Sequence, residues 1–243
     1  MRTFGLLGYP LSHSFSKTYF REKFDREQIT DAEYVNFEEA DLHMFLSKAS
    51  KREDLKGFNV TIPYKEGILP FLDSISDEAS WVGAINTVKR VDNKLIGYNT
   101  DVIGFRESIL PLLNSSHRKA LILGTGGASK AVKYVFDEQQ IASLFISRHK
   151  ERGHLVYEQL TPELLGNYTI IVNTTPLGTY PKEDEAPLIP YEALSPDHVV
   201  FDLVYNPAKT KFLQAAEAQG AAIKNGYEML ELQAEASWAI WNE

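Results

Sequence analysis

A strand that runs into a glycine-rich turn and then into an amphipathic helix constrains this chain more than any other feature. The turn covers Gly124 to Ser129 and directly follows the apolar run Ala120–Leu123. After it, apolar residues recur at the i, i+3, i+4, i+7, i+8 spacing of a helix with one buried face: Ala128, Ala131, Val132, Val135 and Phe136. In such turns one glycine permits the bend, the next lets the backbone approach a pyrophosphate, and the helix N-terminus supplies free N–H groups. The pattern predicts a dinucleotide site, with a plain strand–helix turn as the alternative, since Ser129 stands at the fingerprint's third position.

The residue after the next predicted strand, Ser143–Ser147, indicates which dinucleotide binds. Proteins that bind NAD usually place Asp or Glu there, on the ribose hydroxyls. This chain has Arg148, followed by His149, Lys150 and Arg152. The planar guanidinium suits a 2′-phosphate, so NADP is favoured over NAD. A solvated basic strand end is the alternative.

Strand and helix patterns alternate along the rest of the chain. Candidate strands are Thr3–Gly8, Glu33–Phe37, Gly57–Ile62, Ala84–Val91, Lys94–Tyr98, Ala120–Leu123, Ser143–Ser147, Thr169–Asn173 and Val199–Leu203. Candidate helices are Ser16–Phe24, Asp41–Ser50, Lys65–Leu72, Asp101–Leu113 and Tyr227–Trp241. The alternation predicts an α/β fold with a parallel sheet and right-handed crossovers. The polar segment 113–117 is the predicted joint between an N-terminal open α/β domain (1–112) and a doubly wound Rossmann-type domain (113–225), with a cleft between them.

Composition excludes several classes of function. The 243 residues contain no Cys, which excludes disulfides, thiolate metal sites and a Cys nucleophile. The formal charge of −8 argues against nucleic acid as the main partner. The apolar N-terminal run is too short and too broken by Gly and Pro for a signal peptide or membrane span, so we expect a cytoplasmic protein without a membrane partner. The six His show no metal-ligand spacing, so no metal is expected.

Polar side chains gather at predicted strand ends in the first half. Ser14 and Ser16 follow the first strand, and either could instead cap the next helix. Asn59 and Thr61 share one face of the strand Gly57–Ile62, because side chains alternate along a strand. Lys65 follows at the carboxyl end, where ligands bind in open α/β sheets.

Three further polar residues complete this set. Asn86 heads an apolar strand, and Asp101 precedes a helix whose N-cap it could simply be. Gln233 lies on the apolar stripe of the last helix, either as a hydrogen-bonded core amide or facing a polar ligand. Such hydroxyls, amides, Lys and Asp suit a small polyol acid, and a Lys–Asp pair can transfer a proton beside a carbonyl.

Taken in order, these segments resemble the shikimate dehydrogenase family from end to end. The similar segments are PLSHSFS, GFNVTIPYK, GAINT, GYNTDVIGF, GTGGAS, VNTTPLG, DLVYNPAKTKFL and NGYEMLELQA. The resemblance implies reversible, NADP-dependent reduction of 3-dehydroshikimate to shikimate, in the shikimate pathway of aromatic amino-acid biosynthesis. It also implies that the last helix, 226–243, packs back onto the first domain, and that the protein is a monomer or homodimer.

The resemblance further implies a role for each matching residue. Ser14 and Ser16 would hold the substrate carboxylate, with Tyr205 nearby. Lys65, paired with Asp101, would transfer the proton. The residues for the ring hydroxyls would be Asn59, Thr61, Asn86, Asp101 and Gln233. The cofactor residues would be Gly124, Thr125, Gly126, Gly127, Ala128, Ser147, Arg148, Thr174, Leu203, Gly226 and Met229.

Three features depart from the family pattern. The family's Asn-Arg-Thr is here Ser147-Arg148-His149, and its Pro-Leu-Gly-Met ends here in Thr179. The chain is also short for the family. Two alternatives remain: a quinate dehydrogenase that uses NAD or NADP, and a non-catalytic NADPH or metabolite sensor, which the presence of Lys65 and Asp101 disfavours.

Overall fold

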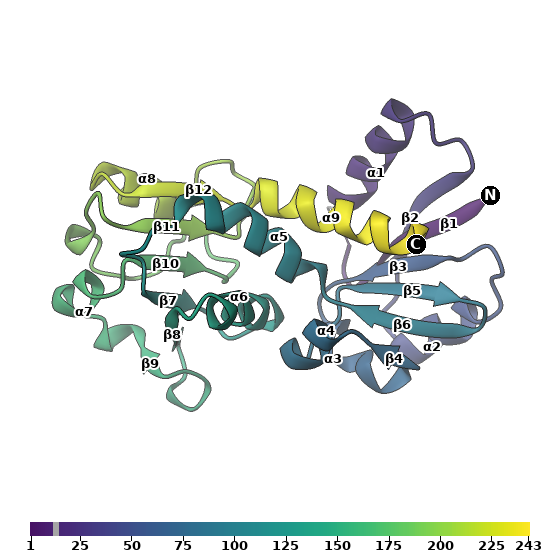
Figure 1. The fold of residues 1–243 in the computed structure, drawn as a ribbon, viewed down its shortest axis with the longest axis horizontal. Helices are drawn as coiled ribbons and strands as arrows, with labels where there is room; N and C mark the ends of the chain where they lie inside the picture. Colours follow the sequence, from purple (N-terminus) through teal and green to yellow (C-terminus); the bar gives the residue numbers. More distant parts are fainter. Residues whose placement is uncertain (12–14) are drawn as a thin grey trace. The chain divides into compact units, whose positions relative to one another are not determined.

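The computed structural model describes residues 1–11 and 15–243, and its elements are shown in Figure 1. By its internal contacts the chain forms two compact units. Unit 1 comprises Met1–Thr100 together with Gln233–Glu243, and unit 2 comprises Asp101–Leu232. The first unit is therefore built from both ends of the chain. Within the described residues, no helix combines the length and apolar composition needed to cross a membrane.

Unit 1 contains a mixed sheet of six strands in the order β2-β1-β3-β5-β6-β4. The strands are β1 (Arg2–Gly8), β2 (Ala32–Glu38), β3 (Gly57–Val60), β4 (Ser74–Ile75), β5 (Thr87–Val91) and β6 (Lys94–Tyr98). Strand β1 pairs in parallel with β2 and β3, whereas β5 pairs antiparallel with β3 and β6. A tight turn at Asp92-Asn93 joins β5 to β6, and Asp92 has a positive φ of 56°.

Two helices of unit 1 begin at residues whose side chains cap them. They are α1 (Phe15–Arg26), α2 (Leu42–Ala49), α3 (Tyr64–Gly67), the 3₁₀ turn η1 (Leu69–Phe71) and α4 (Asp77–Val82). The Asp41 carboxylate accepts from the first amides of α2. Ser76 caps the start of α4, and Gly83 ends it in the left-handed conformation.

The two faces of the unit 1 sheet bury separate clusters. Phe4 and Leu6 of β1 belong to one cluster and Leu7 to the other, as the alternation of side chains along a strand requires. In the first cluster Phe4 stacks on Trp241 at a centroid distance of 4.8 Å, which brings the C-terminal end of the chain onto β1. The last residues therefore complete a core that the first residues begin.

Unit 2 is a doubly wound domain with a fully parallel sheet, in the order β12-β11-β10-β7-β8-β9. The strands are β7 (Lys119–Leu123), β8 (Ala142–Ser147), β9 (Leu155–Val156), β10 (Ile170–Asn173), β11 (Val199–Asp202) and β12 (Ala222–Asn225). The chain order reverses between β7 and β10, where ligands bind in this fold class. The α/β class predicted from the sequence is confirmed.

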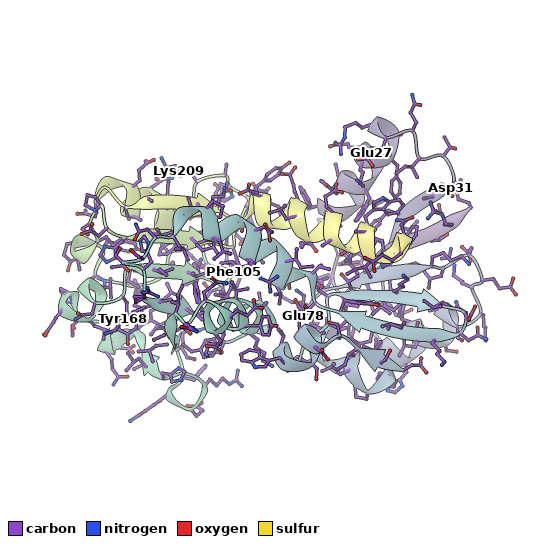
Figure 2. The ribbon with its side chains drawn as sticks, viewed as in Figure 1. Glu27, Asp31, Glu78, Phe105, Tyr168 and Lys209 are labelled. Atoms are coloured by element: carbon purple, nitrogen blue, oxygen red, sulfur yellow. The ribbon has the colours of Figure 1, made fainter. Side chains whose placement is uncertain are left out.

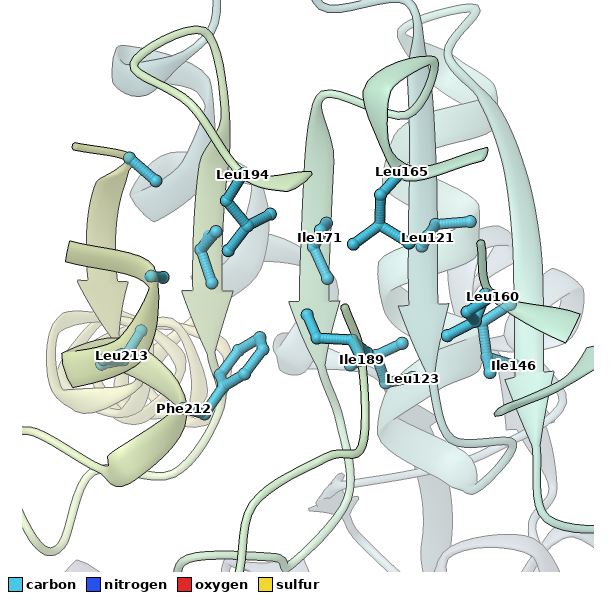
Figure 3. Close-up of a cluster of buried hydrophobic side chains, with 13 residues drawn as sticks. Leu121, Leu123, Ile146, Leu160, Leu165, Ile171, Ile189, Leu194, Phe212 and Leu213 are labelled. Carbon is cyan, nitrogen blue, oxygen red and sulfur yellow. The ribbon is translucent and has the colours of Figure 1, made fainter. Parts of the chain in front are cut away.

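Helices and 3₁₀ turns precede, connect and follow these strands. They are α5 (Thr100–Ile109), η2 (Leu110–Leu112), α6 (Gly127–Glu138), η3 (Lys150–Arg152), η4 (Tyr157–Gln159), α7 (Pro162–Gly166), η5 (Tyr191–Ala193), α8 (Lys211–Ala218) and α9 (Tyr227–Asn242). On one side of the sheet Phe105 of α5, which is labelled in Figure 2, packs edge-on against Phe136 and Phe201. A second cluster includes Leu121, Leu123, Ile171 and Phe212 (Figure 3). It also contains Val200, the neighbour of Phe201 in β11, so it covers the opposite face of the sheet. The central strands are thus buried on both faces, as parallel sheets require.

Candidate active-site residues

A buried hydrogen-bond network in unit 1 holds two of the predicted substrate residues. Asn59, in β3, accepts a 2.8 Å hydrogen bond from the Tyr34 hydroxyl at its Oδ1. Its Nδ2 lies 3.0 Å from Thr87 Oγ1 and 2.9 Å from Ser237 Oγ. All four side chains are buried, so these partners satisfy an amide that would otherwise be costly to remove from water.

Asn86 belongs to the same network through Thr100. Its Oδ1 accepts from the Thr100 amide at 2.7 Å, and its Nδ2 donates to Thr100 Oγ1 at 3.0 Å. The Asn86 carbonyl also accepts from the Val60 amide at 2.8 Å. Side chain and main chain are therefore both fixed at the start of β5, next to the end of β3.

Thr61 and Lys65 follow the end of β3 in the same unit. The Thr61 amide donates to the Leu7 carbonyl at 2.9 Å, which continues the parallel pairing with β1 for one residue. Lys65 lies in the short helix α3, and its carbonyl accepts from the Ile85 amide at 2.7 Å. Both residues are half-buried. The backbone that carries Lys65 is thus tied to the segment leading into Asn86.

The remaining predicted substrate residues are distributed over both units. Ser16 is the second residue of α1, so it does not occupy the N-cap, and it hydrogen-bonds to Tyr34, whose pKa is raised by burial. Gln233 is buried in the part of α9 that belongs to unit 1. Asp101 and Tyr205 belong to unit 2; Asp101 is the buried second residue of α5, inside its first turn rather than at its N-cap. Ser14 lies outside the described residues, and the pairing of Lys65 with Asp101 stays a prediction.

The glycine turn of unit 2 connects β7 to α6 as the sequence predicts. Gly124 has φ +111°, and a Cβ there would lie 2.6 Å from Thr174 Oγ1, so only glycine fits without strain. Thr174 is held by its own hydroxyl, which donates to the Leu123 carbonyl at 2.7 Å. Gly126 is different: it is exposed, its φ is −83°, and a Cβ would meet no atom within 4 Å. The loop therefore leaves open space at the N-terminus of α6.

Ser129 explains how the chain accommodates a departure from the nucleotide fingerprint. Its side chain is buried, and its Oγ donates to the Gly126 carbonyl at 2.6 Å. Ser129, rather than Ala128, belongs to the buried face of α6, which corrects that part of the predicted stripe. The hydroxyl thus ties the first turn of α6 to the glycine turn that precedes it.

The end of β8 presents Arg148 to solvent. Ser147 is buried, and its Oγ accepts from the His149 amide at 3.1 Å, which bends the chain directly after the strand. Arg148 is exposed, and within the described part of the chain no carboxylate forms an ion pair with it. Its positive charge opposes the effect of burial, which raises the pKa of the Tyr157 hydroxyl to about 12. The guanidinium is available for an anion.

The other predicted cofactor residues follow β10, β11 and β12. The Leu203 amide donates to the Asn173 carbonyl at 2.9 Å. Gly226 lies so close to Leu203 that a Cβ would be 2.1 Å from the Leu203 carbonyl oxygen. Met229 is buried one turn into α9. These contacts order three consecutive strand ends in unit 2.

Comparison with known proteins identifies the family. Residues 6–88 match the family model described as the shikimate dehydrogenase substrate binding domain. The NADP(+) shikimate dehydrogenase of Methanococcus aeolicus is 36% identical, over 98% of this chain and 90% of its own. This chain belongs to the shikimate dehydrogenase family.

Solved structures agree with the family assignment. Thermus thermophilus shikimate 5-dehydrogenase, in complex with NADP(H) and shikimate, has a TM-score of 0.88 and 29% identity, covering 99% of this chain and 93% of its own. Corynebacterium glutamicum quinate dehydrogenase, in complex with NAD, has a TM-score of 0.89 and 25% identity with the same coverage. Backbone similarity therefore does not separate shikimate from quinate specificity within the family.

Several residues of the hydrogen-bond network around Asn59 and Asn86 were not predicted from the sequence of this chain. Tyr34 and Ser237, which contact Asn59, lie outside the family-like segments, whereas Thr87 and Thr100 lie inside GAINT and GYNTDVIGF but were assigned no role. Ser237 also had a usable signal, because it is polar and lies four residues after Gln233 on the same helix face. Within the described residues, no group of three or more His, Asp or Glu side chains could hold a metal ion.

A buried carboxylate in unit 2 was also missed. Asp202, at the end of β11, accepts from Thr210 Oγ1 at 2.6 Å, Asn173 Nδ2 at 2.9 Å and the Val204 amide at 3.0 Å. Burial raises the pKa of Asp202 to about 6, and these three donors oppose that rise. The carboxylate connects the loops that follow β10 and β11, which carry Thr174, Leu203 and Tyr205.

Proposed function

We propose that this chain is an NADP-dependent shikimate dehydrogenase that reversibly reduces 3-dehydroshikimate to shikimate, in the shikimate pathway of aromatic amino-acid biosynthesis. The proposal is supported by membership of the family and by Lys65, Thr61, Asn59 and Asn86, which all follow or flank the ends of β3 and β5 in unit 1. Unit 1 would bind the acid and unit 2 the nucleotide. The domains predicted from the sequence, 1–112 and 113–225, have other bounds than these units, because residues 101–112 belong to unit 2.

The residues of the glycine turn fit an NADP cofactor. The open space at Gly126, the N-terminus of the twelve-residue helix α6 and the exposed Arg148 together offer free N–H groups and a fork for phosphates. Gly124, Thr125, Gly127, Ala128 and Ser147 would complete the phosphate site. Thr174, Leu203, Gly226 and Met229 would flank the remainder of the cofactor. When bound, NADPH supplies the hydride for the reduction.

Protein residues would supply the proton and hold the acid. The carbonyl carbon gains the hydride, and the carbonyl oxygen gains a proton from the Lys65 ammonium, which leaves a neutral amine to be reprotonated from water. Asp101 would orient Lys65. Ser14, Ser16 and Tyr205 would bind the carboxylate, and the ring hydroxyls would face Asn59, Thr61, Asn86, Asp101 and Gln233.

A direct assay tests this function against its rival. The purified protein is mixed with shikimate or quinate and with NADP or NAD, and the change in nicotinamide absorbance is followed. We expect the highest kcat/KM with shikimate and NADP. A higher value with quinate and NAD would favour the quinate alternative, to which the similarity with the quinate dehydrogenase points. Cofactor binding without turnover of either acid would indicate a sensor. The cytoplasmic location and the monomeric or homodimeric state stay predictions from the sequence.

A further inference from the structure

The hydroxyl of Ser237 joins helix α9 to the hydrogen-bond network around Asn59 and Asn86. It is fully buried, and its Oγ lies 2.9 Å from Asn59 Nδ2, 2.7 Å from Thr87 Oγ1 and 3.1 Å from Thr100 Oγ1. It also donates to the carbonyl of Gln233, one helical turn earlier, at 2.9 Å. One atom thus contacts β3, β5, the start of α5 and the backbone of the residue proposed to bind substrate.

A second contact fixes the same helix face one turn later. Trp241 Nε1 donates to the Val88 carbonyl at 3.0 Å. The helix lies so close to the sheet that a Cβ on Gly57 would be 2.3 Å from Trp241 Nε1. Gln233, Ser237 and Trp241 are each four residues apart, so they share one face of α9. The helix can neither rotate nor slide along β5 without breaking both contacts.

We infer that Ser237 is a positioning residue, which holds Gln233 in place for the substrate. This inference rests on the proposed function. Ser237 itself would touch neither substrate nor cofactor, because its hydroxyl is enclosed by protein partners. Trp241 secures the far end of the same face, and Ser237 secures the turn next to Gln233.

The inference predicts a specific pattern of kinetic effects. Ser237→Ala removes the contact next to Gln233 and should raise the KM for shikimate about five- to tenfold, the size expected for one lost hydrogen bond. The kcat and the KM for NADP should stay within about twofold, because Lys65 and the glycine turn are untouched. Trp241→Phe is the matched control: it removes the indole N–H one turn further on, lowers stability, and should leave the KM for shikimate within about twofold.

A double-mutant cycle with Gln233→Ala decides whether Ser237 acts through Gln233. All variants are assayed at a temperature at which circular dichroism shows them folded. In the Gln233→Ala background, Ser237→Ala should change the KM for shikimate by less than about twofold, since the group it positions is gone. The same five- to tenfold rise in both backgrounds, or no rise in either, would overturn the inference. If the wild-type protein turns over no shikimate, the proposed function fails instead, and the two failures are distinguished.

Discussion

The main chain at Lys65 is fixed by the Ile85 amide, while its side chain sits on a helix of only four residues, directly after the end of β3. The fixed backbone limits the positions that the Lys65 ammonium can reach. The side chain is only half-buried, so the ammonium does not lie in the hydrophobic core. A fixed backbone position suits an acid–base group, because the group must lie within hydrogen-bond reach of the atom that gains or loses the proton.

Lys65→Ala should therefore remove proton transfer and leave substrate binding largely intact. We expect kcat to fall by roughly 10²- to 10⁴-fold, the usual contribution of one general acid or base, with a small change in the KM for shikimate. Steady-state kinetics in both directions measure this. Lys56→Ala is the control, since Lys56 is an exposed lysine of the same unit whose ammonium donates to the Glu53 carbonyl. Turnover close to that of the wild type would exclude Lys65 as the acid.

Arg148 should determine the choice between NADP and NAD. The exposed guanidinium of Arg148 is not paired with a carboxylate of the described chain. Arg148→Ala should therefore remove the contact with the 2′-phosphate without breaking an ion pair within the protein. The KM for NADP should rise roughly 10- to 100-fold, as for a lost hydrogen bond to a charged group, and the KM for NAD should hardly change. Arg152→Ala, a nearby exposed arginine, serves as the comparison. Equal losses for both cofactors would contradict the assignment.

At the scale of elements, local signals predicted most strands and helices, and tertiary contacts decided the rest. The helix expected at Lys65–Leu72 is split into α3 and η1, because Pro70 cannot continue an α-helix. Strand β4 has two residues and helix α4 six, too short for a periodic pattern, although Ser76 and Gly83 mark the ends of α4. Local sequence patterns could not predict the hydrogen-bond network around Asn59, because it joins residues up to 178 positions apart.

Two glycines of the β7–α6 turn should respond differently to alanine. Gly124→Ala introduces a Cβ at φ +111° and 2.6 Å from Thr174 Oγ1, so it should lower the free energy of unfolding by about 1–3 kcal/mol and also weaken NADP binding. Gly126→Ala meets no atom, so its stability cost should stay below about 1 kcal/mol while NADP binding weakens. Urea unfolding and cofactor titration separate the two effects. Equal destabilisation by both substitutions would contradict the structure.

At the scale of the whole molecule, the two units can be followed separately. The three tryptophans, Trp81, Trp238 and Trp241, all belong to unit 1, so their fluorescence reports on that unit alone. Circular dichroism reports on the helices of both units. A substitution confined to unit 2 should therefore shift the dichroism transition and leave the fluorescence transition in place.

The pH dependence of stability at Asp202 tests whether the unfolding of unit 2 can be followed separately. Its folded-state pKa of about 6 exceeds the ordinary 3.8, so the folded protein binds this proton more tightly than the unfolded chain does. The resulting stabilisation is complete below pH 3.8 and is lost as the pH rises through 6, by about 3 kcal/mol in all. Relative to Asp202→Asn, which cannot ionise, the wild type should lose this amount between pH 4 and pH 7 in urea unfolding followed by dichroism. A difference that does not vary with pH would show that the folded and unfolded pKa values are equal.

The division of unit 1 between both ends of the chain has a consequence for its biosynthesis. Met1–Thr100 leave the ribosome first, but Trp238 and Trp241 follow only after all of Asp101–Leu232 has been translated. At about 5–20 residues per second, the nascent segment waits on the order of ten seconds with Phe4 and Phe20 uncovered. Unit 2 is contiguous and has no such delay. Folding during synthesis should therefore finish with the half of the protein that was made first.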